Sequence, residues 1–243
     1  MINTQIVLEK CAPFISSQAS AGYVPALPAT SPALLAVTIS RQSGSGAHAV
    51  AEALADYLQA HAPDKSRSWR VFDRNLVEKV LEDHHLPARY ARFMPEDRIS
   101  EFGDALEELL GAHPPSWTLL RQIEETVQHL AMEGNVILIG RGANLITRKL
   151  DHVFHVRLVG SLERRVKHFQ EFQGVTREAA LRMIRNEDRG RKRYVRKYFE
   201  EDLDNPLLYN LVLNTDLMPY PEAAQMIGAT ALQRLQQRAK NLP

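Results

Sequence analysis

The stretch best suited to chemistry is a glycine-containing turn between an apolar run and a helix-forming run. Leu35 to Ile39 has the β-branched, apolar character of a buried strand, and Ala47 to Leu58 that of a helix. Gly44 and Gly46 allow backbone N–H groups to curl around an anion, and a helix N-terminus adds unpaired donors and partial positive charge. The residues predicted to bind phosphate surround these glycines: Arg41, Gln42, Ser43, Gly44, Ser45, Gly46, Ala47 and His48.

The turn departs from the full phosphate-binding pattern G-x-x-x-x-G-K-[ST], in which Lys reaches the outer phosphates. Registered on Gly44 and Gly46, the chain has Arg41 at the first glycine and Ala47 at the lysine. Arg41 is therefore the candidate substitute for the missing cation. The alternative interpretation is an ordinary strand-to-helix turn that binds nothing.

Composition limits the class of protein. The 243 residues suffice for one α/β domain with a substantial core, and the net charge of +1 gives no overall case for nucleic acid or an acidic membrane. Cys11 is the single cysteine, which excludes an intrachain disulfide and a cysteine metal cluster and suits a reducing cytoplasm. Because no apolar run reaches about 18 residues, we expect no membrane span and a cytoplasmic location.

The elements that must position the turn follow from hydrophobic periodicity. Residues 1–33, rich in Ala, Ser and Pro, read as a flexible extension, and residues 34–243 as one domain. We expect a helical insertion on the acceptor side at about 84–133 and a basic lid at about 185–200. Within the insertion, the pattern predicts helices from about Ser100 and from Ser116 to Gly134. The remaining predicted strands are 69–72, 136–139, 153–159 and 208–213.

Two of these strands end in polar residues, where open α/β sheets bind ligands. Asp73 and Arg74 follow the strand 69–72, and Gly140-Arg141-Gly142 follows the strand 136–139. A guanidinium at a strand end can grip a phosphate bidentately. The alternatives are that Asp73 only caps a helix and that Arg141 only pairs with a core carboxylate. Histidines 84, 85 and 113 are too scattered to predict a metal site.

A basic segment follows the last predicted internal helices. Seven of the thirteen residues from Arg185 to Lys197 are basic, and Gly190 is expected to interrupt the segment like a hinge. A mobile arm of this kind could close over polyphosphate, neutralise charge and exclude water. A solvated charged face is the usual alternative. RNA binding is a third interpretation, although no aromatic stacking module accompanies the basic run.

The order of these motifs resembles nucleoside monophosphate kinases, most closely the cytidylate-kinase-like family, over about residues 35–230. The motifs that carry the resemblance are Ile39-Ser-Arg-Gln-Ser-Gly-Ser-Gly46, Phe72-Asp-Arg74, Gly140-Arg-Gly-Ala143, Asp188-Arg-Gly-Arg-Lys-Arg193 and Leu208-Tyr-Asn-Leu-Val-Leu-Asn-Thr215. The resemblance implies a three-layer α/β/α fold with a parallel sheet, of the P-loop nucleoside-monophosphate-kinase type.

The resemblance also implies a reaction and its residues. The γ-phosphoryl group of ATP would move to a nucleoside monophosphate of the CMP or dCMP type, or to a similar small phosphorylated acceptor. Asp73, Arg74 and Arg141 would face this acceptor. The lid residues implied as catalytic are Arg185, Asp188, Arg189 and Arg191, with Asp188 orienting the arginines.

Departures from the family pattern bear on the cofactors. Cytidylate kinases have Gly-Arg-Asp where this chain has Gly140-Arg141-Gly142, so the carboxylate implied in cytosine recognition is missing. Nucleoside monophosphate kinases carry a hydroxyl, which bears on Mg²⁺ placement, where this chain has Ala49. Mg²⁺ would therefore arrive with ATP rather than on protein ligands. The expected partners are nucleotide substrates, with no membrane, no strong case for nucleic acid and an open oligomeric state. The alternative function is a nucleotide-binding protein with little or no transfer activity, which Ala47 and Ala49 favour.

Overall fold

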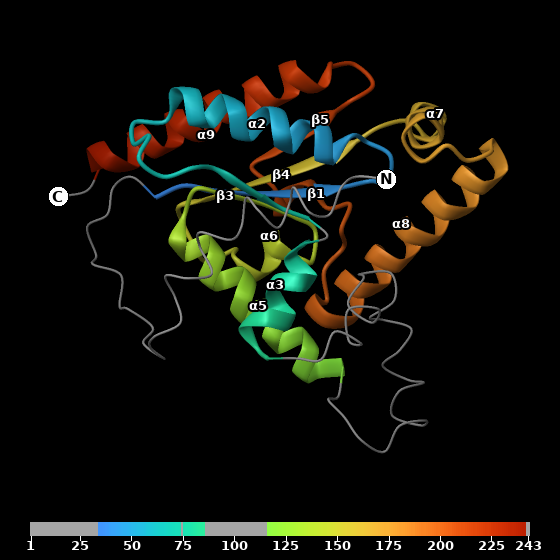
Figure 1. Cartoon of the computed structure of the whole chain (residues 1–243), viewed down its shortest axis with the longest axis horizontal. Helices are drawn as coiled ribbons and strands as arrows, with labels where there is room; N and C mark the ends of the chain where they lie inside the picture. The colour runs from blue at the N-terminus through green and yellow to red at the C-terminus, as the bar shows by residue number, and fades with distance from the viewer. Residues whose placement is uncertain (1–33, 74, 86–115, 242–243) are drawn as a thin grey trace. The chain divides into compact units, whose positions relative to one another are not determined.

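The protein is described by a computed structural model over residues 34–73, 75–85 and 116–241 (Figure 1). Five parallel strands form one sheet in the order β2-β3-β1-β4-β5. The strands are β1 (Ala36–Arg41), β2 (Arg70–Phe72), β3 (Val136–Ile139), β4 (Val153–Val159) and β5 (Leu211–Asn214). The predicted Arg74 and the predicted helix from about Ser100 lie outside the described residues, as does the extension 1–33.

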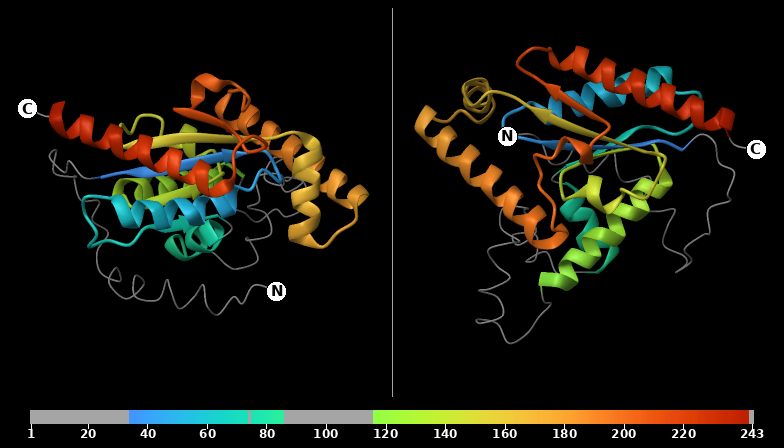
Figure 2. Two further views of the ribbon diagram at one scale, coloured as in Figure 1. Left: turned by 90° about the horizontal axis from the view of Figure 1, so that it is seen from above. Right: turned by 180° about the vertical axis from the view of Figure 1, so that it is seen from behind.

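Helices α2 (Ala47–His61) and α9 (Tyr220–Asn241) lie side by side over one face of the sheet (Figures 1 and 2). Val37 and Ile39 of β1 point into this layer and are almost fully buried. Val50, Leu54 and Leu58 meet them from α2, at the helical spacing that the sequence predicted. The central strand and the helix after the glycine turn are thus held by one apolar core.

The opposite face of the sheet is covered by α3 (Asn75–Asp83), α5 (Ser116–Glu133) and the short α6 (Ala143–Ile146) (Figure 1). Ile123, Val127 and Leu130 of α5 are buried here, as predicted, and Gly134 at φ +74° follows the helix end. Helices on both faces of an all-parallel sheet confirm the predicted three-layer α/β/α architecture.

Helices α7 (Leu162–Gln173) and α8 (Arg177–Phe199) follow β4, and α8 runs beside the sheet as one long helix (Figure 2). Ser161 and Thr176 cap their N-termini through side-chain oxygens, which is the usual role of Ser and Thr at this position. The expected interruption at Gly190 was wrong, because α8 continues through this residue. Gly190 is buried within the helix, on the side that packs against the rest of the protein.

The last strand is shorter than predicted. Pro206–Leu208 forms a turn of 3₁₀-helix capped by Asn205, and β5 begins only at Leu211. The side chain of Asn210 accepts a hydrogen bond from the backbone of His155 just before β5. Proline at the start of a helical turn and a local side-chain cap therefore override the apolar pattern that favoured a strand from Leu208. None of the helices in the described ranges combines the length and apolar character needed to cross a bilayer.

Candidate phosphate-binding site

The glycine turn, residues 42–46, connects the carboxyl end of central strand β1 to the N-terminus of α2. Gln42 anchors it to the neighbouring strand: its N–H donates to the carbonyl of Leu158 (3.0 Å), and its side-chain oxygen accepts from the N–H of Gly160 (3.0 Å). The N–H and hydroxyl of Ser45 both donate back to the Gln42 carbonyl, at 3.2 and 2.8 Å. The turn is therefore held in one conformation by strand β4 and by itself.

Both glycines of the turn are needed for close packing as well as for backbone conformation. Gly44 and Gly46 have φ of +81° and +80°. A Cβ on Gly44 would lie 2.5 Å from the carbonyl oxygen of Arg165, and a Cβ on Gly46 would lie 2.3 Å from the ring of Tyr220. Helices α7 and α9 thus approach the turn from two sides at distances that only glycine allows.

A carboxylate already occupies one amide of this turn. The N–H of Ser43 donates to Oδ1 of Asp188 at 2.8 Å, and the hydroxyl of Ser43 donates to the carboxylate of Glu187. Both acids come from α8, the helix that carries the basic segment. A backbone N–H in a glycine turn that binds a carboxylate has the chemistry of an anion site.

Two buried arginines converge on the same point. Arg165 of α7 donates to the carbonyl of Ser43 (3.0 Å) and to Oδ2 of Asp188 (2.7 Å). Arg191 of α8 donates to Oδ1 of Asp188 (2.7 Å) and to the Ser43 hydroxyl, while its buried Nε has no partner among the described residues. Arg165 and Arg191 are 8% and 7% exposed. A second anion placed here would therefore meet two guanidinium groups that water hardly screens.

The charge state of Asp188 follows from these contacts. Burial by itself would raise the pKa of Asp188. The N–H of Ser43 and the guanidinium groups of Arg191 and Arg165 outweigh it, so the pKa lies below its ordinary value. Asp188 is thus a carboxylate that holds two arginines at the turn.

The predicted lid arginines divide between two sides of α8. Arg191 reaches the glycine turn with Asp188, whereas Arg185 and Arg189 lie exposed on the outer side of the helix. Arg189 donates to the carbonyl of Arg185 (3.3 Å) and to the side chain of Asn186 (2.8 Å). The structure does not bring Arg185 and Arg189 to the turn, and a role for them in a lid stays a prediction.

The strand ends beside the turn gather several predicted residues. Asp73, after β2, lies 3.9 Å from the guanidinium of Arg41 and 4.0 Å from Nδ1 of His48. Nε2 of His48 also lies 3.3 Å from Glu52. Arg41 thus lies against Asp73, the predicted acceptor-side residue. The sequence analysis had instead offered Arg41 as the substitute for the missing lysine, which would contact the phosphates of ATP.

Arg141 occupies an unusual backbone conformation after β3. Gly140, Arg141 and Gly142 have φ of +79°, +58° and +66°, and a positive φ is uncommon for arginine. Two aromatic residues of α8 cover the segment: the Tyr194 hydroxyl donates to the Arg141 carbonyl (3.2 Å), and a Cβ on Gly142 would lie 2.8 Å from Phe199. Arg141 is 9% exposed. Helix α8 therefore contacts both strand-end segments that the sequence singled out.

Sequence reasoning missed two buried arginines of the site region. Arg165 was not singled out, because nothing in its local pattern separates it from an exposed basic residue. Arg157 did leave a signal, because it is a charged residue in the largely apolar strand β4. Its guanidinium donates to the Ser40 hydroxyl (2.9 Å), at the end of β1, and to Asp204.

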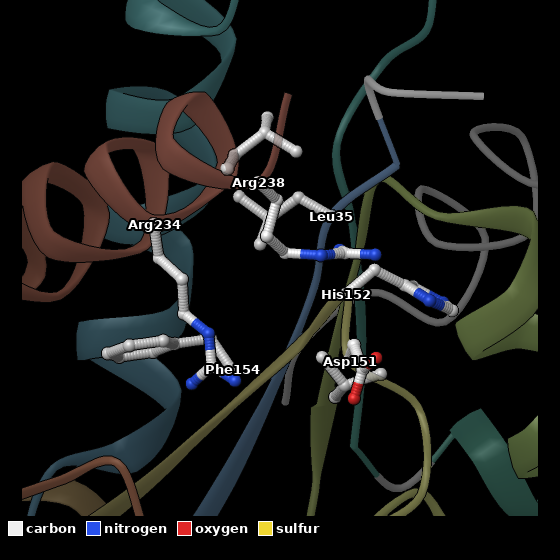
Figure 3. A pocket seen from close by; sticks show the side chains of 8 residues that line it. Leu35, Asp151, His152, Phe154, Arg234 and Arg238 are labelled. Atoms are coloured by element: carbon white, nitrogen blue, oxygen red, sulfur yellow. The ribbon is translucent and has the colours of Figure 1, made fainter. Parts of the chain in front are cut away.

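Two hollows elsewhere in the described residues lack the pair of buried arginines found at the glycine turn. One, of about 250 Å³, lies beside α6 and is lined by residues that include Asn144, His155 and Tyr209. The other, at the amino ends of β1 and β4, is lined by Leu35, His152, Phe154 and Arg234 (Figure 3). Its volume is about 10 Å³, room for about one water molecule. Within the described ranges, no group of three His, Cys, Asp or Glu side chains could hold a metal ion. The glycine turn is therefore the candidate site.

The parallel sheet with helices on both faces and a glycine turn after its central strand defines a P-loop kinase type of fold. The model of the cytidylate kinase-like family matches residues 36–217, and the chain belongs to this family. Similar proteins include the cytidylate kinases of Pyrococcus horikoshii, at 27% identity over 66% of this chain and 82% of that protein, and of Methanopyrus kandleri, at 26% identity over 63% and 84%.

A solved structure shares the fold. An uncharacterized protein from Eubacterium ventriosum superposes with a TM-score of 0.58 at 20% identity, covering 82% of this chain and 98% of that one. Family membership and the similarity to curated cytidylate kinases support a kinase that acts on a small molecule.

Proposed function

We propose that the protein transfers the γ-phosphoryl group of ATP to a nucleoside monophosphate of the CMP or dCMP type, or to a similar small phosphorylated acceptor. The observation that carries the proposal is the anion site at Ser43, where a backbone N–H and two buried arginines converge on one carboxylate. The family and its cytidylate kinase relatives support the choice of nucleotides.

ATP fits this site by charge and by position. Its phosphates would take the place of the Asp188 carboxylate on the Ser43 amide, and the first N–H groups of α2 would add donors. Arg165 and Arg191 would neutralise the phosphates at short range. Mg²⁺ would arrive bound to the nucleotide and neutralise charge on it.

The reaction asks mainly for positioning. An oxygen of the acceptor phosphate attacks the γ-phosphorus of ATP, the bond to the β–γ bridging oxygen breaks, and ADP leaves with that electron pair. Asp73 and Arg141, at the ends of β2 and β3, would face the acceptor beside the turn. Before ATP binds, Asp188 would hold Arg165 and Arg191 at the turn, and its carboxylate would then give way to the phosphates.

A second candidate function is nucleotide binding with little or no transfer. Ala47 and Ala49 favour it, because they replace the lysine and hydroxyl that kinases use on the phosphates. Arg41 lies beside Asp73, which leaves Arg165 and Arg191 as the cations at the turn.

The test is ADP formation from Mg·ATP with CMP, dCMP, UMP, AMP and GMP as separate acceptors. We expect turnover with at least CMP or dCMP. Arg191→Lys should lower kcat about 10²–10³-fold, because a lysine cannot bridge Ser43 and the transferring phosphate. Arg121→Lys, on the exposed side of α5, is the matched control. If calorimetry shows ATP binding but no acceptor is phosphorylated, the proposal is refuted in favour of nucleotide binding with little or no transfer.

A further inference from the structure

The outer side of α8 carries a row of arginines. Five exposed arginines follow one another at steps of three, four, four and three residues: Arg182, Arg185, Arg189, Arg193 and Arg196. At about 100° per residue these steps keep all five within an arc of about 80°, and at about 1.5 Å per residue the row is about 21 Å long. We call these five residues the basic face of α8.

Of the acidic residues of α8, only Glu178, one turn before Arg182, lies on the side of this face. The helix contains three acidic residues, of which Glu187 and Asp188 point to the glycine turn and Glu178 lies in the first helical turn. From residue 189 to residue 199 the sequence has no Asp or Glu. A protein with a net charge of +1 thus concentrates positive charge along one helix.

The apolar side of α8 is occupied by the protein's own core. Ile184, Tyr194 and Val195 are buried, so α8 has no apolar side with which to enter a bilayer. The basic face itself carries no apolar or aromatic side chain, although buried aromatic anchors dominate most protein–protein interfaces. A linear row of guanidinium groups without apolar or aromatic side chains is better suited to bind a linear polyanion than a folded protein.

We propose that the basic face of α8 binds single-stranded nucleic acid through its phosphates, without reading the bases. Arginine binds phosphate bidentately, and successive arginines along the row meet successive charges of an extended strand. The face lies on the other side of α8 from Asp188 and Arg191, so nucleic acid and ATP bind together rather than in competition. This activity goes beyond the proposed kinase function.

The test is fluorescence anisotropy of a labelled twelve-residue oligouridylate with the full chain at several salt concentrations. Five phosphate contacts predict a slope of log K against log salt of about −3.5. Replacing Arg182, Arg193 and Arg196 with Gln should reduce the slope to about −1.4 and weaken binding about 100-fold at 0.1 M salt. These three residues were chosen because none is among the lid residues implied as catalytic, which are Arg185, Asp188, Arg189 and Arg191.

The matched control replaces three exposed basic residues elsewhere with Gln: Arg121, Lys149 and Lys240. It makes the same charge change and should leave slope and affinity nearly unchanged. Equal losses in the two triple variants would overturn the proposal in favour of a general charge effect. If saturating Mg·ATP displaces the oligonucleotide, the oligonucleotide binds at the glycine turn and the proposal is also overturned. Tighter binding of poly-glutamate than of oligouridylate would indicate an acidic protein partner instead.

Discussion

Replacing Asp188 by Asn separates two roles of the carboxylate at the glycine turn. Asp188 accepts three short hydrogen bonds, from the N–H of Ser43 and from the buried guanidinium groups of Arg165 and Arg191. Its side chain is 21% exposed, and those of the two arginines are 9% exposed. Asp188→Asn keeps the size of the side chain and removes the charge that these donors share.

The expected cost is about 3 kcal/mol, the lower end of the range for removing one partner of a buried ionic cluster. At about 2–4 °C per kcal/mol for a domain of this size, the melting temperature should fall by about 6–12 °C. ATP should nevertheless bind about tenfold more tightly, because the Ser43 amide and both guanidinium groups become available, and 1.4 kcal/mol corresponds to a factor of ten.

The assays are thermal unfolding and calorimetric titration with Mg·ATP. Asp204→Asn is the control, since this carboxylate pairs with Arg157 and Lys192 instead of the turn; it should leave ATP affinity unchanged. Weaker ATP binding in Asp188→Asn would refute the reasoning, because it would mean that Asp188 assembles the arginines for ATP and does not stand in the place of a phosphate.

Two further predictions concern packing and pH. Gly46→Ala should destabilise the fold by about 2–3 kcal/mol in urea unfolding, because its Cβ would meet the ring of Tyr220. The control Gly174→Ala has a φ of +66° but open space around its Cβ, and should cost about 1 kcal/mol. Equal costs for the two variants would contradict the close approach of Tyr220 to Gly46. Burial, with a smaller effect of Arg234, lowers the pKa of His155 to about 4. Because the unfolded histidine binds its proton near pH 6.5, the free energy of unfolding should decline as pH falls from about 6.5 to about 4. His155→Gln should flatten this decline when urea midpoints are measured across that pH range. An unaltered slope would exclude His155 as the source of the decline.

The sequence by itself determined the elements and the place of the site. The apolar run 136–139 and the largely apolar, valine-rich segment 153–159 indicate buried strands, and both were confirmed residue for residue. Ser161, Thr176 and Gly174 are local signals for helix ends that act through their own neighbours, so they too could be read from the chain. A glycine turn after a central strand likewise predicted the position of the candidate anion site.

Only the tertiary structure decided which charges meet at that position. Arg165 and Asp188 are distant in sequence from Ser43 and indistinguishable, by type and local pattern, from solvated charges on amphipathic helices. The packing of α7 and α8 against the sheet selects Arg191 for the turn and leaves Arg185 and Arg189 outside, because one helical residue differs from the next by about 100° in direction. Gly190 was misread for the same reason: a glycine in a basic run signals a hinge locally, whereas here it faces the interior of the protein.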